Sequence, residues 1–465
     1  GIQTYGGTVI IGSNVSLDSN NNKITFNGTV NSESSEANTL TIDVGSSEVE
    51  FNGIVGGAAN GGLGAISITG ALNLDAAIIS AASLSVSTTT NLAADVTTTG
   101  TQTYGDGISS GAVVLEVDTI LTTTNSNITF NGTVRSDSAG TPRDLTINLD
   151  ANNTGSTTAD VIINGIVGGA SLPLDVITIT GDLDLNSSIG NSPGATSITV
   201  SGDANLGADV ETTGTQTYSG AVTISNDITL TTTDSNITFS STVDGDGTAR
   251  DLTIDMDNSG VGADGTVQFV NTVGANDDLD VIDITGNLNL DAAISNTASL
   301  SVSGTSNLGA DVTTSSTQTY SGAVVLSADT TLTTTDSNIT FGATIDSDSA
   351  GSTRDLTLTL GSGSASITGI VGTTSLDVLT LNSSASFTAA VTATSIVNAA
   401  NKTATFSDDL TAAVTNSGGL LFNHTGAGAT VDITYTAGGA DIIRVEDTQD
   451  NVAPAVVTFA NAINA

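Results

Sequence analysis

The sequence predicts an all-β protein, a parallel β-helix (β-solenoid) with rungs of roughly 20 residues. Three observations support this fold class: the chain repeats itself, a shorter apolar unit recurs inside each repeat, and the composition favours strands. Hydrophobic residues make up 38% of the chain but aromatic residues only 3%, so any core must be aliphatic. Val, Ile and Thr are stiff, branched side chains that pack well on a pleated surface.

The longer repeat spans about 100 residues. It is marked by the phrase QTY and, further on, by the phrase ITF. We expect their aromatic residues to be structural anchors: Tyr5, Tyr104, Tyr218 and Tyr320 in QTY, and Phe26, Phe130, Phe239 and Phe341 in ITF. The repeats divide the chain into residues 1–100, 101–214 and 215–316, a partial fourth copy at 317–372 and a divergent region at 373–465. Without linkers between them, we expect one continuous rod.

The shorter unit is an aromatic or aliphatic anchor followed four positions later by Val or Ile, as in Tyr5/Val9 and Phe26/Val30. The strand before each anchor alternates apolar and polar residues, which is the period of a half-buried strand. About five units per copy predict about 23 rungs, each of which buries its apolar face only against its neighbours. Four tandem β-sandwich domains are the alternative fold.

The charge of the chain excludes some partners. There are 48 acidic and 7 basic residues, for a net charge of −41. Nucleic-acid binding needs Lys and Arg to neutralise phosphates, so no nucleic acid is expected as a partner. Anionic membrane surfaces are equally unsuited, and no apolar run is long enough to predict a membrane span. The acidity favours solubility and divalent cations.

Acidic loops precede three arginines that share one repeat position. We expect each arginine to hold its own loop through a charge-assisted hydrogen bond. The alternative is a Ca²⁺ site made of loop carboxylates and carbonyl groups. The arginines are Arg143, Arg250 and Arg354, and the candidate calcium ligands are Asp137, Asp244, Asp246, Asp346 and Asp348. A second acidic run, Asp277, Asp278, Asp280 and Asp283, is a comparable candidate.

Catalysis is not predicted. The chain has one histidine, His424, and nothing near it in the sequence supplies the partners of a hydrolase triad. Parallel β-helices also include polysaccharide-active enzymes, which are a remote alternative here. Seven cations suit an acidic sugar substrate poorly, and acids that recur with the repeat indicate architecture more than a unique site.

The segment Thr215–Phe239, TQTYSGAVTISNDITLTTTDSNITF, resembles the β-strand-repeat surface proteins of bacteria. These are similar to filamentous-haemagglutinin and autotransporter-passenger β-helices. The resemblance implies a right-handed coil, secretion, an extracellular or cell-surface location, and a role in adhesion, fibres or cell coats.

The N-terminal residues match the repeat at once, since Gly1–Tyr5 already contains QTY. An uncapped strand edge is a template for pairing with another chain. We therefore expect a structural protein whose copies associate end to end into a cell-surface fibre, filament or coat. The alternative is a rod-like adhesin, as a passenger fragment, that binds a host or matrix glycan or protein.

Overall fold

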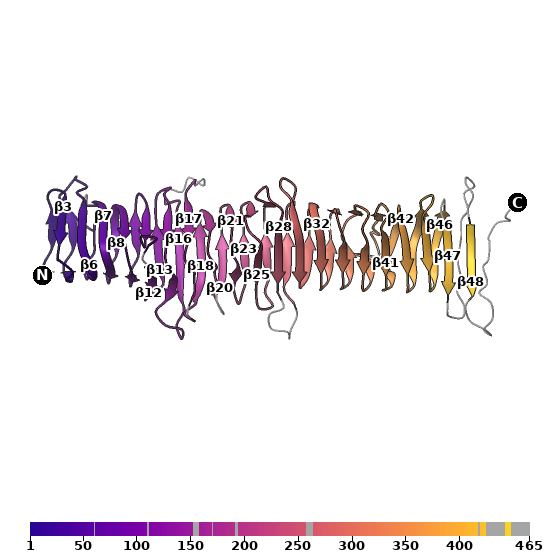
Figure 1. Cartoon of the computed structure of the whole chain (residues 1–465), viewed down its shortest axis with the longest axis horizontal. Coiled ribbons are helices and arrows are strands. Elements are labelled where there is room, and N and C mark those ends of the chain that lie inside the picture. The colour runs from indigo at the N-terminus through magenta and orange to yellow at the C-terminus, as the bar shows by residue number, and fades with distance from the viewer. Residues whose placement is uncertain are drawn as a thin grey trace. The chain divides into compact units, whose positions relative to one another are not determined.

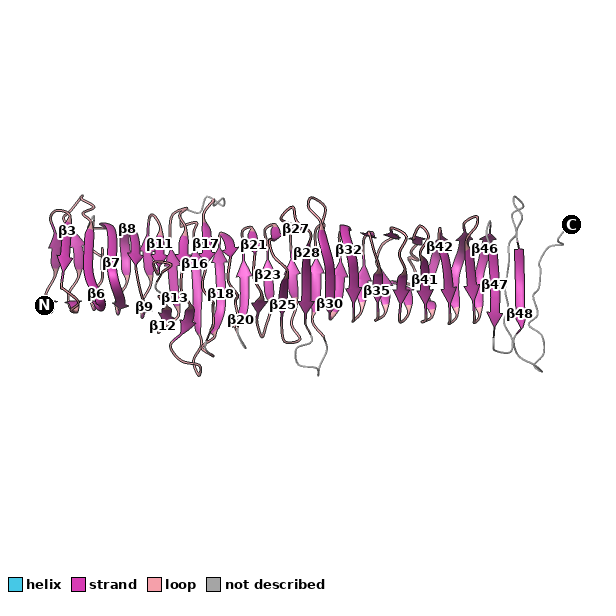
Figure 2. Ribbon diagram, in the orientation of Figure 1, coloured by secondary structure: helices cyan, strands magenta, loops and turns pink. Residues whose placement is uncertain are grey.

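The computed structural model describes residues 1–59, 61–108, 111–151, 158–169, 171–190, 194–256, 264–416, 419–424 and 442–447. All regular structure in these residues is β-strand, without helix, as Figure 2 shows. The strands form the stacked coils of a β-solenoid with about 19 turns. The chain divides into two compact units, Gly1–Ser240 and Ser241–Ala465, which are described separately.

The first unit is coloured indigo to pink in Figure 1. Most of its strands are three to seven residues long, because Gly, Asn, Asp and Ser interrupt them at the corners of the coil. Its strands are β1 (Gln3–Tyr5), β2 (Val9–Ile11), β3 (Val15–Asp18), β4 (Ile24–Phe26), β5 (Val30–Ser32), β6 (Leu40–Phe51), β7 (Leu63–Leu74), β8 (Ile78–Val86), β9 (Thr90–Leu92), β10 (Val96–Thr98), β11 (Gln102–Tyr104), β12 (Val113–Leu115), β13 (Thr119–Thr122), β14 (Ile128–Phe130), β15 (Val134–Ser136), β16 (Arg143–Asn148), β17 (Asp160–Ile163), β18 (Leu174–Thr180), β19 (Asp182–Leu185), β20 (Ala195–Val200), β21 (Ala204–Leu206), β22 (Val210–Glu211), β23 (Gln216–Tyr218), β24 (Val222–Ile224), β25 (Ile228–Thr231) and β26 (Ile237–Phe239).

The second unit, coloured pink to yellow in Figure 1, is built in the same way. Its strands are β27 (Val243–Gly245), β28 (Arg250–Asp255), β29 (Thr266–Phe269), β30 (Leu279–Thr285), β31 (Asn287–Leu290), β32 (Ile294–Val302), β33 (Ser306–Leu308), β34 (Val312–Thr314), β35 (Gln318–Tyr320), β36 (Val324–Leu326), β37 (Thr330–Thr334), β38 (Ile339–Phe341), β39 (Ile345–Ser347), β40 (Leu356–Thr359), β41 (Ser364–Ile367), β42 (Val371–Leu381), β43 (Ser384–Phe387), β44 (Val391–Asn398), β45 (Thr403–Phe406), β46 (Leu410–Asn416), β47 (Gly419–His424) and β48 (Ile442–Asp447).

Strands of successive turns pair in parallel throughout the described residues, as in β1 with β4 and β38 with β41. The β-sandwich alternative is therefore wrong, because sandwich sheets are antiparallel. Turn lengths vary: Gln102 pairs with Leu84 in the preceding turn and with Ile128 in the following one, so one turn takes 18 residues and the next 26. Corner loops lengthen some turns, and the described residues form about 19 turns, against about 23 expected for the whole chain.

Each turn of the first unit places strands on three ladders. Tyr5 pairs with Phe26 on one ladder, which continues through Phe51 and Leu74 to Leu92. Tyr104 lies on another ladder, opposite Val86. Tyr218 lies on the third, opposite Val200. One copy of the sequence repeat thus makes four whole turns plus two further strand positions, close to the roughly five units per copy predicted from the sequence.

The core is aliphatic, with short aromatic stacks where the anchors meet. Phe26 lies between Tyr5 and Phe51, with ring centroids 4.9 and 5.1 Å apart. Tyr104, Tyr218 and Tyr320 stack in the same way on the ITF phenylalanine of the next turn, at 5.3–5.4 Å: Phe130, Phe239 and Phe341. The rings replace the Leu and Ile pairs found elsewhere on the same ladders.

Glycines allow the turns to approach closely at the corners. A Cβ atom at Gly132 would overlap the carbonyl oxygen of Gly111 in the preceding turn, and one at Gly165 would overlap that of Gly132. Only a residue without a side chain fits there, which explains why Gly follows Asn in the phrases Asn131–Gly132 and Asn164–Gly165.

Candidate sites in the recurring motifs and the surface hollows

The QTY motif forms a buried hydrogen-bond network at a corner of the coil. The hydroxyl of Tyr104 donates to Oε1 of Gln102 at 2.9 Å, and both side chains are fully buried. Nε2 of Gln102 donates to the carbonyl of Thr122 in the next turn at 2.9 Å and to that of Val96 at 3.2 Å. Burial raises the pKa of the Tyr104 phenol above its usual range, so the phenol stays protonated as a donor.

The same network recurs in the third and fourth copies. Gln216 and Gln318 each donate at 2.9 Å to a carbonyl of the following turn, that of Thr231 or of Thr333. In the first copy, Gln3 and Tyr5 are only partly buried, but Gln3 donates to the equivalent carbonyl, that of Asp18, at 2.9 Å. The motif ties turns together from inside, and its polar atoms are occupied.

The three repeat arginines each hold an aspartate through two parallel hydrogen bonds. Arg143 binds Asp137 through Nε at 3.0 Å and Nη2 at 3.3 Å. Arg354 binds Asp348 at 2.9 and 3.1 Å. The Arg250–Asp246 pair has the same geometry, at 3.1 and 2.9 Å. In each pair the hydrogen bond from arginine lowers the pKa of the carboxyl group: Asp137, Asp246 and Asp348. We call these three pairs the Arg–Asp clasps.

The other two predicted calcium ligands face the next turn. Asp244 accepts from the backbone N–H and the side-chain amide of Asn276, both at 2.9 Å. Asp346 accepts from the backbone N–H of Thr374 at 2.8 Å. All five predicted ligands therefore have a protein partner, and no group of three or more His, Cys, Asp or Glu side chains in the described part of the chain is placed to hold a metal. Calcium at these loops remains a prediction.

A further recurring aspartate forms hydrogen bonds between successive turns. Oδ1 of Asp144 accepts from the backbone N–H of Val176 at 3.0 Å, and Asp251 and Asp355 bind Val281 and Val378 in the same way. These are the aspartates of the phrase DLT, just after each repeat arginine. Much of the acidity that recurs with the repeat thus has a structural partner.

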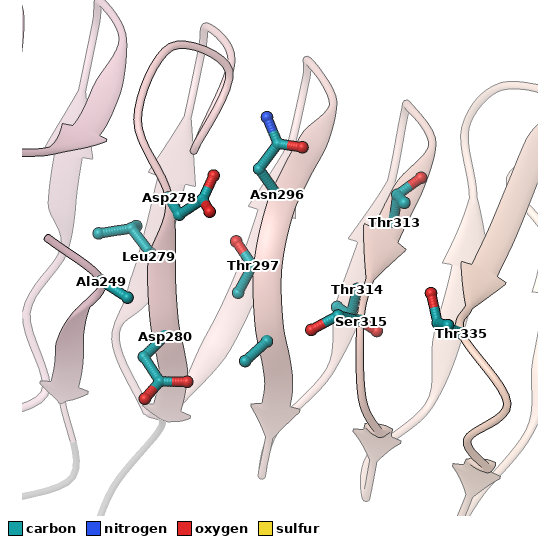
Figure 3. Close-up of a pocket in the computed structure, with 11 residues that line it drawn as sticks. Ala249, Asp278, Leu279, Asp280, Asn296, Thr297, Thr313, Thr314, Ser315 and Thr335 are labelled. Atoms are coloured by element: carbon teal, nitrogen blue, oxygen red, sulfur yellow. The ribbon is translucent and has the colours of Figure 1, made fainter. Parts of the chain in front are cut away.

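A polar hollow of about 410 Å³ opens on the surface of the second unit. Its floor is formed by Leu279, Thr297 and Thr314, which are paired across β30, β32 and β34 and are buried. Figure 3 shows Asp278, Asn296 and Thr313 in a row along one edge, with Asp280 on the opposite side. Ser315 and Thr335 complete the rim. We call this site the threonine-floored hollow.

A second hollow, of about 340 Å³, lies on the first unit and is strongly acidic. Asp160 and Asp182 stand directly opposite each other on β17 and β19. Burial raises the pKa of Asp160, and the charges of Asp182 and Asp184 raise it further. Burial also raises the pKa of Asp182, with a contribution from Asp203. Asp182, Asp184 and Asp203 accept hydrogen bonds from neighbouring turns.

Sequence reasoning noted Asp278 and Asp280 only as an acidic run and did not find the hollow. His424 ends β47, but its side chain lies outside the described residues. A signal for the hollow exists in the repeat: two of its edge residues, Asp278 and Asn296, break the pattern, whereas Asp280 recurs as Asp175 in the second copy. The equivalent row contains Gly62 and Ser80 in the first copy, and Pro173 and Gly194 in the second.

Comparison with known proteins identified no similar protein. A scan against protein-family models, a search of curated proteins and a search of solved structures each found no match. Within the described residues there is no helix of the length and apolar character needed to cross a membrane. The class of the molecule is thus defined by its own geometry, a β-solenoid whose recurring polar residues bind one another.

Proposed function

We propose that this chain is an extracellular structural protein, a non-catalytic subunit of a fibre, filament or coat. The observation that carries the proposal is how the recurring residues are used. The buried Gln–Tyr networks, the DLT aspartates and the Arg–Asp clasps all bind groups within the coil. Residues repeated in this way maintain a long, uniform scaffold, which is what a fibre or coat subunit requires.

End-to-end association of copies is part of the proposal. Each described turn pairs with its neighbours along the same parallel ladders, and such a ladder is self-complementary because the edge that one turn presents matches the edge that the next turn accepts. The high negative charge opposes side-by-side clustering of copies and favours growth along one direction.

Electron microscopy and light scattering of the full chain test this proposal. We expect filaments many times longer than one chain, whose mass grows with protein concentration. The same samples with added Ca²⁺ and with a chelator separate a calcium-dependent assembly from an intrinsic one. A monodisperse monomer under every salt, calcium and concentration condition would contradict the proposal.

The second candidate function is an adhesin. The observation that favours it is the threonine-floored hollow, where Asp278 and Asn296 depart from the repeat and the rim is polar and exposed. A monomeric chain with a bound glycan or protein would distinguish this function from polymerisation.

A further inference from the structure

The threonine-floored hollow has rim groups that the protein itself does not use. The side chains of Asp278, Asp280, Asn296, Thr313, Ser315 and Thr335 are exposed and make no hydrogen bond or ion pair with another described residue. The recurring aspartates differ, since Asp244, Asp251 and Asp346 accept hydrogen bonds from the following turn. Carboxylates, an amide and hydroxyls therefore line this concave surface and are available to a ligand.

The hollow follows the stacking direction of the coil. Its residues come from five successive strands of one ladder or from their ends: β28, β30, β32, β34 and β37. The four intervals between these strands, at about 4.8 Å each, give a length of about 19 Å. A floor of this length and a shallow, open rim suit a short linear polymer rather than a compact small molecule.

Charge selects the kind of polymer. The lining contains two carboxylates and no cation; Arg250, which pairs with Leu279 across β28 and β30, lies beside the hollow but is held by Asp246 of its own loop. With a net charge of −41 on the whole chain, an anionic polysaccharide is repelled and a cationic chain is attracted. Hydroxyl and amide groups on the rim add partners for sugar hydroxyls.

We propose that the threonine-floored hollow binds a linear oligosaccharide that carries free amino groups, such as a run of glucosamine residues. Asp278 and Asp280 pair with the ammonium groups, and Asn296, Thr313 and Ser315 bind sugar hydroxyls. No aromatic ring stacks on the sugar, so a single site binds weakly, with a dissociation constant on the order of 1 mM.

The departure from the repeat supports a function at this place. Glycine or proline occupies the position of Asp278 in the first two copies, and Ser80 and Gly194 stand at the position of Asn296. Asn296 also has a backbone φ of 49°, in the left-handed region where glycine is favoured. Ser80 and Gly194 do not have a positive φ, so the copy that carries the hollow differs from the first two copies here in both backbone conformation and side chain.

The test is calorimetric titration of the full chain with glucosamine tetramer, N-acetylglucosamine tetramer and tetralysine. We expect the glucosamine tetramer to bind most tightly. The variant Asp278→Asn/Asp280→Asn should weaken binding about tenfold. Its matched control, Asp408→Asn/Asp409→Asn, removes two exposed charges from the same unit outside the hollow and should change affinity less than about twofold.

A third variant separates recognition from charge. Asn296→Gly keeps the backbone conformation and the net charge but removes the amide, and should weaken binding of the glucosamine tetramer about threefold. The proposal is overturned by an equal loss in both double variants, by tetralysine binding as tightly as the sugar, or by no binding of glucosamine tetramer. Because microscopy tests the fibre and titration tests the hollow, either can fail without the other.

Discussion

The buried Gln–Tyr network and the exposed Arg–Asp clasp recur with the same repeat but differ in their surroundings. Gln216 and Tyr218 are 0% exposed and bridge two turns. Arg354 and Asp348 hold a single loop at the surface, with side chains 25% and 33% exposed. A buried polar group that loses its partner cannot bind water in its place, so the full cost of desolvation remains. The two members of an exposed ion pair can each bind water when the pair is broken, so the cost is small. Equal recurrence in the sequence therefore does not mean equal contribution to stability.

The largest effect is expected from Tyr218→Ala. Removing a fully buried ring leaves a cavity beside Phe239 and should lower local stability by about 3–5 kcal/mol. Because a solenoid does not unfold in one step, hydrogen exchange of β23 and β26 in the full chain is the suitable measurement. Tyr5→Ala is the matched control and should cost clearly less, since Tyr5 is partly exposed. Equal losses of local stability in the two variants would show that burial of the ring does not determine its contribution.

A smaller loss is expected from Gln216→Leu. The hydroxyl of Tyr218 loses its acceptor, and the carbonyl of Thr231 loses a donor, which should cost about 2 kcal/mol by the same measurement. Adding Tyr218→Phe to this variant should recover part of the loss, because no hydroxyl is then left unsatisfied. Gln3→Leu, at the partly exposed copy of the motif, should cost clearly less.

A gain in stability is expected from Thr90→Val. The hydroxyl of Thr90 is buried without a hydrogen-bond partner, and the equivalent residue in the second copy is Ala204. Replacing the hydroxyl by a methyl group of similar size should stabilise the turn by about 1 kcal/mol. Thr98→Val is the matched control. Thr98 is equally buried, but its hydroxyl donates to the carbonyl of Gly100 at 2.6 Å, so removing this hydroxyl should destabilise the turn.

The pH dependence of the acidic hollow should be modest and opposite to that of the clasps. The pKa of Asp182 is raised in the folded chain, so its favourable contribution is present below the usual aspartate pKa of about 3.9 and is lost as the pH rises through the folded value. Asp182→Asn should therefore stabilise the chain at neutral pH and not at pH 3.5. Denaturation midpoints relative to wild type measure this. The pKa of Asp137 is lowered in the folded chain. Its ion pair should therefore stabilise the fold above about pH 3.9, and this contribution should be lost as the pH falls through the folded pKa.

The smallest effect is expected from Arg354→Ala. The clasp is exposed and screened, so the change in unfolding midpoint should be slight in low salt and absent in about 0.5 M salt. Local hydrogen exchange of the 348–354 loop should increase, since the arginine fixes that loop. A midpoint shift that persists unchanged in high salt would contradict the contrast between buried network and exposed clasp.

The sequence was sufficient for the fold class and for the pairing of arginine with its loop. Alternation of apolar and polar residues sets a strand period, and the unit of about 20 residues indicates stacking of turns. The position of Arg143 close to Asp137 made a local clasp the simplest expectation. These inferences rely on residues close together in the chain, where spacing limits the possible geometry.

Only the tertiary structure decided which motifs share a ladder. Corner loops change the length of each turn, so QTY in the first, second and third copies lies on three different ladders. Stacking also places Asp278, Asn296 and Thr313 in one row, although they are far apart in the sequence. The sequence by itself determined the strands, the aliphatic core and the charge, because each depends on local composition and period. Register determined the buried networks and the hollow, because these depend on the summed length of every preceding loop.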